Sequence, residues 1–197
     1  MPLHDRIHGH FQVSAHTTLE AADALTPHIE QAARLIVHCL TQGNKIMACA
    51  NGGSAADAQH FASSMIHRFE QERPGLAAIA LTTDTSALTS IADDTAYDQV
   101  FARQVKALGQ PGDILLAIST SGNSPSVLQA VAAAHARSAH VIALTGRSGG
   151  KLAEQIAEDD VFLCVPAESA ARIQEVHLLT IHCLCDAVDS VLLGVEE

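Results

Sequence analysis

Five short apolar runs recur along the chain, each followed by a loop of small residues and then by a stretch with helical periodicity. The runs are 45–49, 76–81, 113–118, 140–144 and 160–165. Their spacing of roughly thirty residues is typical of repeated strand–helix units. Such units build a parallel sheet with helices on both faces, and their right-handed crossovers restrict the topology further. The sequence therefore predicts one α/β domain with three layers.

Helical segments are expected before and after these repeats. Within 3–41, Pro27 suits the first turn of a second helix and Gly43 its end, so we expect a helical hairpin there. A long amphipathic helix is expected over 169–193. Both apolar faces could pack on the sheet or on a second copy of the chain, and the sequence does not separate these alternatives. The single domain 1–197 is thus divided into 1–43 for oligomer packing, 44–168 for the sheet core and 169–197 for the last helix.

Composition excludes several classes of function. Hydrophobic residues make up 48% of the 197 residues and charged residues 17%, which is enough apolar surface for a core and excludes intrinsic disorder. The formal net charge is −11 and only 3% of the residues are aromatic. Both values argue against direct binding of nucleic acid, because its phosphates need cations and its bases need aromatic stacking partners.

The cysteines and the N-terminus indicate a cytoplasmic protein. The five cysteines form no paired framework, so we interpret them as reduced thiols. No uninterrupted apolar stretch approaches the roughly 20 residues of a membrane span. The first residues also lack the basic and apolar regions of a signal peptide. We therefore expect no membrane segment.

Two loops after predicted strands are suited to bind a ligand, because parallel sheets bind ligands at the carboxyl ends of their strands. The sequence Ala-Asn-Gly-Gly-Ser at 50–54 has two glycines and a capping serine, which fits either a tight turn or a ligand loop. The sequence Ser-Thr-Ser-Gly-Asn-Ser at 119–124 precedes Pro125, which suits the first position of a helix. Hydroxyls and free amides at a helix N-terminus form an anion site without a fixed positive charge. We therefore predict phosphate binding there.

Polar residues on two predicted helices share a face. His60, Ser64 and Arg68 are spaced by four, and Gln174 and His182 lie eight residues apart. A lone histidine in an apolar helix is more often part of the core than a ligand, and the chain has 12 histidines. The shared faces favour His60 and His182 as functional residues over the others.

Four motifs together resemble the sugar isomerase (SIS) domain family. They are Asn-Gly-Gly-Ser at 51–54, Ala-Gln-His-Phe at 58–61, the loop 119–124 and Arg-Ile-Gln-Glu-Val-His at 172–177. Over its whole length the chain resembles the phosphoheptose isomerases and their sister group, the DnaA initiator-associating proteins. The resemblance implies a flavodoxin-like fold, a homotetramer, a phosphosugar ligand and zinc. For the isomerases it implies conversion of sedoheptulose 7-phosphate into an aldose heptose 7-phosphate for lipopolysaccharide-core synthesis.

The resemblance also implies roles for individual residues. His182 and the position of Ser64 would be catalytic, and the metal ligands would be His60, Gln174 and His182. The residues that would bind substrate or phosphate are Asn51, Gly53, Ser54, Arg68, Asp93, Asp94, Ser119, Thr120, Ser121, Ser124 and Gln174.

One departure from the isomerase pattern leaves the function open. Ser64 stands where the isomerases have a glutamate that acts as base and metal ligand. Serine does not replace a carboxylate, and loss of one general base lowers a rate by roughly 10²–10⁴. Enzymatic turnover would then depend on His182, with Glu175 as a candidate carboxylate. The alternatives are a non-enzymatic regulator of replication initiation that binds DnaA, for which Leu192 and Leu193 are candidate contacts, and a sugar-phosphate sensor.

Overall fold

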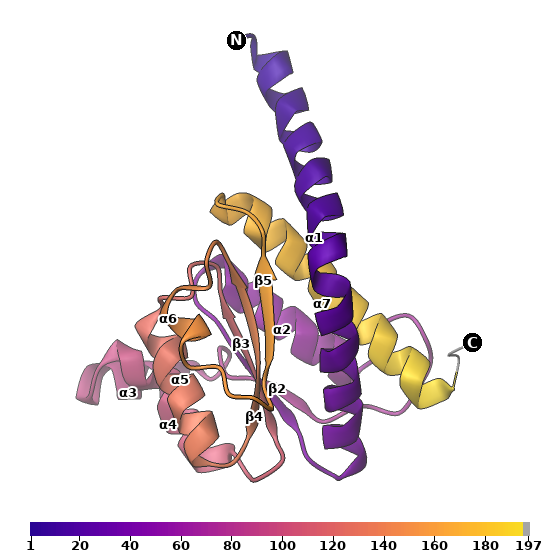
Figure 1. Cartoon of the computed structure of the whole chain (residues 1–197). Helices are drawn as coiled ribbons and strands as arrows, with labels where there is room; N and C mark the ends of the chain where they lie inside the picture. The colour runs from indigo at the N-terminus through magenta and orange to yellow at the C-terminus, as the bar shows by residue number, and fades with distance from the viewer. Residues whose placement is uncertain (195–197) are drawn as a thin grey trace.

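All five expected strands form one parallel sheet in the order β2-β1-β3-β4-β5 (Figure 1). The computed structural model describes residues 1–194 of the chain. The strands are β1 (Ile46–Cys49), β2 (Ala78–Ala80), β3 (Ile114–Ser119), β4 (His140–Gly146) and β5 (Val161–Val165). From β1 the chain moves to β2 on one side and then returns to β3 on the other. This reversal is the switch point at which doubly wound sheets bind their ligands.

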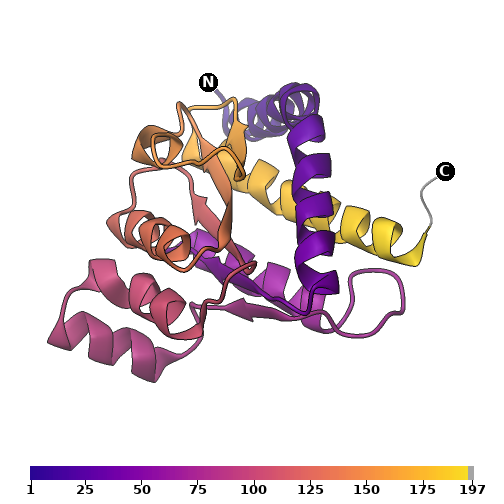
Figure 2. The ribbon, with the colours of Figure 1, turned by 60° about the horizontal axis from the view of Figure 1, so that its bottom comes forward.

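Helices cover both faces of the sheet, as predicted for three layers (Figures 1 and 2). The helices are α1 (Leu3–Thr41), α2 (Gly53–Ile66), α3 (Thr85–Asp94), the 3₁₀ turn η1 (Tyr97–Gln99), α4 (Val100–Leu108), α5 (Pro125–Ala136), α6 (Gly150–Ala153) and α7 (Ala170–Leu193). Side chains of α1, α2 and α7 share one core cluster with the sheet, and those of α4, α5 and α6 share the other. The helix expected at the C-terminal end is confirmed.

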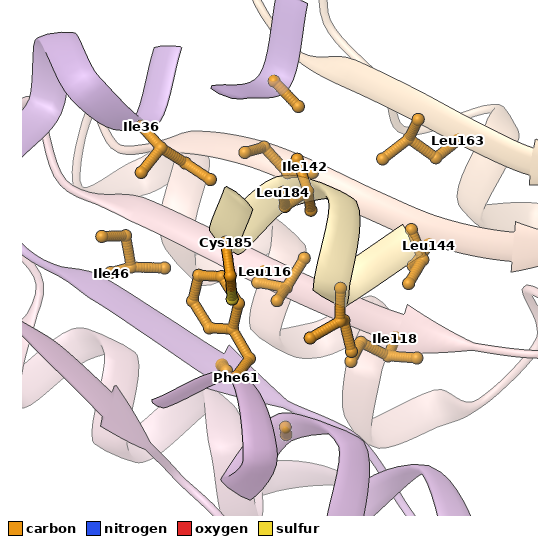
Figure 3. Packing of buried hydrophobic residues seen from close by; sticks show 14 of the residues in the cluster. Ile36, Ile46, Phe61, Leu116, Ile118, Ile142, Leu144, Leu163, Leu184 and Cys185 are labelled. Atoms are coloured by element: carbon orange, nitrogen blue, oxygen red, sulfur yellow. The ribbon is translucent and has the colours of Figure 1, made fainter. Parts of the chain in front are cut away.

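Alternate side chains of each central strand enter the two cores. In β3, Leu116 and Ile118 lie in the cluster with α1, α2 and α7, whereas Leu115 and Ala117 lie in the cluster with α4 and α5. Figure 3 shows Leu116 beside Phe61 of α2 in the first of these cores. Because both faces are covered, the strand is apolar throughout, and each fully buried leucine or isoleucine contributes about 1.5–3 kcal/mol.

The predicted N-terminal hairpin is wrong, because 3–41 form one continuous helix of 39 residues. Pro27 lies inside it, and this residue bends the helix rather than ending it. Figure 2 shows the first part of α1 nearly end-on and the second part from the side. The second part is held by burial of Ala32 and Ile36 against the core formed with α7. Tertiary packing therefore outweighs the backbone hydrogen bond that proline cannot make.

The helix α7 is a core helix despite its apolar composition. Its 24 residues include an 18-residue stretch with a mean hydropathy of 1.6, so by length and composition the helix could cross a membrane. Instead it packs along α1 and the sheet face (Figure 1), and its buried residues include the polar His177, Thr180 and Asp189. Asp189 is paired with the buried Arg73, whose Nε lies 2.5 Å from Asp189 Oδ1.

A buried carboxylate joins β1 to β3 at the edge of the sheet away from the strand ends that carry the loops. Asp113 accepts hydrogen bonds from the backbone N–H groups of Lys45 (3.0 Å) and Gln110 (2.8 Å), and its Oδ2 lies 2.5 Å from Lys45 Nζ. Burial raises the pKa of Asp113, but these hydrogen bonds outweigh burial and hold the pKa below its ordinary value. The carboxylate therefore stabilises the fold in its ionised form.

Replacing Asp113 by asparagine should lower the free energy of unfolding by about 3–5 kcal/mol at pH 7, because Lys45 and two N–H groups lose a buried anion. Urea denaturation measures this change. Asp159→Asn, at an exposed carboxylate, is the control and should unfold like the wild type. Equal midpoints for Asp113→Asn and the control would show that the carboxylate contributes nothing.

Acid should destabilise the fold through His177. Burial lowers the pKa of His177 from 6.5 to about 4, although a hydrogen bond to Thr145 opposes the shift. Between these two pH values the unfolded chain binds a proton that the folded chain does not, so stability falls as the pH drops from 6.5 to 4. The loss reaches about 3 kcal/mol.

The measurement is the free energy of unfolding against pH for the wild type and for His177→Gln, which lacks the titrating ring. The wild-type curve should fall more steeply over this interval. Parallel curves would contradict the assignment of the shift to His177.

Candidate active site

The loops that follow β1 and β3 meet at the switch point and line one pocket of about 290 Å³. The first loop leads into α2 and the second into α5, so two helices begin at the pocket. Its lining residues are Asn51, Gly52, Gly53, Ser54, Ile118, Ser119, Thr120, Ser121, Ser124 and Gln174. The structure thus brings together the predicted substrate-binding residues except Arg68, Asp93 and Asp94.

The loop 119–124 has backbone N–H groups without a protein partner. Within residues 1–194, the N–H groups of Thr120, Ser121 and Ser124 donate to no protein oxygen. The loop turns at Gly122, whose φ of +65° is readily adopted only by glycine. Unpaired N–H groups and hydroxyls next to two helix N-termini favour an anion, because the helix dipoles are positive at that end.

Asn51 ties the two loops together. Its side-chain amide donates to the hydroxyls of Ser124 (2.6 Å) and Ser126 (2.8 Å), and its carbonyl accepts a hydrogen bond from Tyr97 (2.9 Å). These bonds give Asn51 a part in shaping the pocket. The sequence reasoning missed Ser126 and Tyr97. The only signals were the serine directly after Pro125 and the fact that Tyr97 is the one tyrosine of the chain.

The glycine at the start of α2 lets α7 approach. A Cβ at Gly53 would lie 3.3 Å from Nε2 of Gln174, so a larger residue would crowd the glutamine. This close approach places Gln174 in the pocket wall. Gly53, predicted as a substrate- or phosphate-binding residue, thus lies in the pocket lining at a position where a side chain would crowd Gln174.

Farther along the same two helices lie the two histidines that the spacing singled out. Nε2 of His60 in α2 lies 3.0 Å from Nε2 of His182 in α7, and their rings meet edge to face with centroids 5.1 Å apart. The ring of Phe69 lies 5.6 Å from that of His182. At a rise of 1.5 Å per residue, His182 lies about 12 Å along α7 from Gln174. The structure thus joins the two histidines in a partly buried pair at a distance from the pocket.

Of the other predicted members of this face, Ser64 remains in α2 one turn after His60, and Arg68 does not. Ser64 is buried, with its hydroxyl against Cys185. Arg68 does not share the face, because α2 ends at Ile66. Its guanidinium instead pairs with Glu72 at 3.1 Å. The spacing of four holds within the helix and fails beyond its end.

Three further acidic residues lie outside the pocket lining. Asp93 and Asp94 are exposed at the end of α3. Glu175, the candidate carboxylate, accepts hydrogen bonds from Arg172 (2.6 Å) and from Ser14 of α1 (2.7 Å). The contact with Ser14 joins Glu175 to α1 and the contact with Arg172 lies within α7, so neither partner belongs to the pocket or to the histidine pair.

The residues present do not fit a zinc site. Within residues 1–194, no group of three or more His, Cys, Asp or Glu side chains is placed to hold a metal. His60 and His182 supply two nitrogen ligands, Ser64 supplies no carboxylate, and Gln174 lies about two helical turns away. A protein zinc site needs three or four ligands, usually charged or imidazole. The predicted metal set is therefore incomplete.

Comparison with known proteins identifies the family. The model of the SIS domain matches residues 10–146. A phosphoheptose isomerase of Thiobacillus denitrificans is 82% identical over 197 residues, which is 100% of both chains. The solved phosphoheptose isomerase from Neisseria gonorrhoeae is 53% identical with a TM-score of 0.92, and the alignment covers 96% of this chain and 100% of that chain.

The solved phosphoheptose isomerase from Francisella tularensis agrees with these matches. It is 47% identical with a TM-score of 0.94, and the alignment again covers 96% of this chain and 100% of that chain. These identities extend over the sheet, both ligand loops and the flanking helices. The chain therefore belongs to the SIS-domain family and, within it, to the phosphoheptose isomerases.

Proposed function

We propose that the chain is an aldose–ketose isomerase that interconverts sedoheptulose 7-phosphate and an aldose heptose 7-phosphate, as a step of lipopolysaccharide-core synthesis. The observation that carries the proposal is the pocket at the switch point, where unpaired N–H groups and hydroxyls converge at the starts of α2 and α5. The chain's full-length similarity to phosphoheptose isomerases supports the same substrate class.

The pocket holds the phosphate of the sugar. Its lining has no lysine or arginine, so the anion is bound by the helix N-termini and by hydroxyl donors. The hydroxyl donors are Ser54, Ser119, Thr120, Ser121 and Ser124. The rest of the sugar extends from the pocket past Gln174 along the contact between α2 and α7, toward His60 and His182.

The histidine pair transfers the proton. In the ketose-to-aldose direction, the imidazole of His182 takes a proton from C1, and the electron pair of that C–H bond forms the C1–C2 double bond. The C2 carbonyl oxygen takes up a proton from solvent at the same time, which gives the enediol. His182 then returns its proton to C2 while the O1 hydroxyl gives its proton to solvent and becomes the C1 carbonyl of the aldose, with no external oxidant or reductant. His60 orients the ring of His182 through the 3.0 Å contact between their Nε2 atoms. Ser64 takes no part in this step.

The proposed reaction uses no zinc, because residues 1–194 hold no group of three or more side chains placed to bind it. A homotetramer is expected, since the N-terminal half of α1 exposes apolar residues that a second copy can cover. The exposed residues are Leu3, Ile7, Phe11, Val13 and Leu19. The five cysteines are all free thiols, which supports a cytoplasmic location.

Neither the structure nor the comparisons favour the alternative of a DnaA-binding regulator, which was suggested by the serine at position 64 in the sequence. The candidate contact Leu192 is half-buried against the core, which leaves Leu193 as the exposed member of the pair.

His182→Ala should lower kcat for sedoheptulose 7-phosphate about 100- to 10,000-fold, because it removes a general base. The affinity for inorganic phosphate should stay unchanged, since the pocket lies about 12 Å away along α7. Aldose formation and phosphate titration calorimetry measure the two quantities. His28→Ala, at an exposed histidine of α1, is the matched control. Absence of turnover by the wild type would refute the proposed reaction.

Ser64→Glu should create a zinc site, because it adds a carboxylate one helical turn from His60. After dialysis the wild type should retain almost no zinc, and the variant about one ion per chain. Ser63→Glu adds the same charge at an exposed neighbour and should bind none. Elemental analysis measures the content. Stoichiometric zinc in the wild type would contradict the proposal that the reaction uses no zinc, whether or not the variant folds.

A further inference from the structure

The motif at 172–177 contains a histidine that has no part in the chemistry described above. His177 is fully buried in α7, and its Nε2 lies 2.9 Å from the backbone oxygen of Thr145. Because a carbonyl accepts, Nε2 carries the hydrogen and donates it. Nδ1 has no hydrogen-bond partner among residues 1–194. The ring is therefore neutral, and its one hydrogen bond within residues 1–194 is the bond that Nε2 donates to the backbone oxygen of Thr145.

That acceptor lies directly behind the phosphate pocket. Thr145 is paired in register with Ser119, the last residue of β3 and part of the pocket lining. The next residue, Gly146, packs so closely on Ile173 of α7 that a Cβ would overlap the isoleucine side chain. The first turns of α7 thus fix the carboxyl end of β4 from one side.

The loop after β4 supports the phosphate loop in turn. The N–H of Leu152 donates to the backbone oxygen of Gly122 (2.9 Å), and the N–H of Lys151 donates to Oδ1 of Asn123 (3.1 Å). A Cβ at Gly122 would collide with the backbone of Gly149. These contacts hold acceptor groups of the loop 119–124 on the side of α6, which leaves its unpaired N–H groups available to the pocket.

We propose that His177 is a positioning residue for phosphate binding: its hydrogen bond to Thr145 fixes the end of β4 and, through the segment 146–152, the phosphate loop 119–124. This inference rests on the proposed function, since it assigns the pocket to phosphate. It adds a residue that touches no ligand and acts through the backbone of β4.

The test compares His177→Leu, which loses the donor, with His177→Gln, whose amide can donate from nearly the same position as Nε2. The probe is inorganic phosphate, titrated calorimetrically at pH 7.5 and at a temperature where each protein is folded. Leucine should weaken phosphate binding about tenfold or more, because small displacements of a binding loop have large effects. Glutamine should restore an affinity close to that of the wild type, which a merely space-filling role would not predict.

The matched control is His135→Leu. His135 lies in α5 and pairs with the buried Asp160 at 2.8 Å, and Asp160 accepts from the N–H of Val141 near the other end of β4. This variant also loses a histidine hydrogen bond and should be destabilised, yet its phosphate affinity should match that of the wild type.

The results distinguish the positioning role of His177 from the proposed function of the chain. If the wild type binds phosphate and His177→Leu binds it equally well, the positioning role is refuted while the proposed function stands. Failure of the wild type to bind phosphate refutes both. If His177→Leu does not fold, His177→Asn serves as the disrupting variant, because its shorter side chain does not reach Thr145. Unchanged affinity in that variant likewise refutes the role.

Discussion

The contact between α2 and α7 is the constraint on which the site depends. The two helices run side by side in the same direction, so Gly53 meets Gln174 near their beginnings and His60 meets His182 farther along. Beyond the end of α2, the buried Arg73 donates to backbone oxygens at its last turn and pairs with Asp189 of α7. Breaking a buried ion pair lowers the free energy of unfolding by several kcal/mol. The relative position of the two helices is therefore fixed at both ends, and with it the geometry of the histidine pair.

In the proposed phosphate site, backbone and hydroxyl groups take the place of basic side chains, which is how an acidic chain would hold an anion there. The net charge of −11 opposes anions over the whole molecule, but screening limits that effect to about 10 Å at ordinary ionic strength. Within the pocket, two helix N-termini and the free N–H groups of the loop 119–124 dominate. Asn51 keeps the two loops together without a charge of its own.

The sequence predicts those features that depend on local periodicity. The apolar runs located all five strands, and the central strands β1 and β3 are buried on both faces. The helical spacing singled out His60 in α2 and His182 in α7, and the structure places their rings in contact. The hairpin prediction failed because Pro27 was expected to begin a second helix. In the structure, packing of the second part of α1 stabilises one helix that continues past Pro27. The prediction that Arg68 shares a helix face with His60 failed because no glycine or proline marks the end of α2 at Ile66. The side chains that form hydrogen bonds with Asn51 come from distant parts of the chain. No local sequence pattern predicts such contacts.

The site has two parts, and a substitution can change one of them without changing the other. Phosphate binding depends on strand ends and on the loops that follow β1 and β3, and these are held by β4 and α6 from behind. The proposed proton transfer depends on the contact between α2 and α7, which holds the histidine pair. Ser64 lies in the second part, buried in α2 with its side chain against Cys185, and it is not among the residues that line the phosphate pocket. A substitution at this position can therefore alter the chemistry at the histidine pair while the phosphate site stays intact.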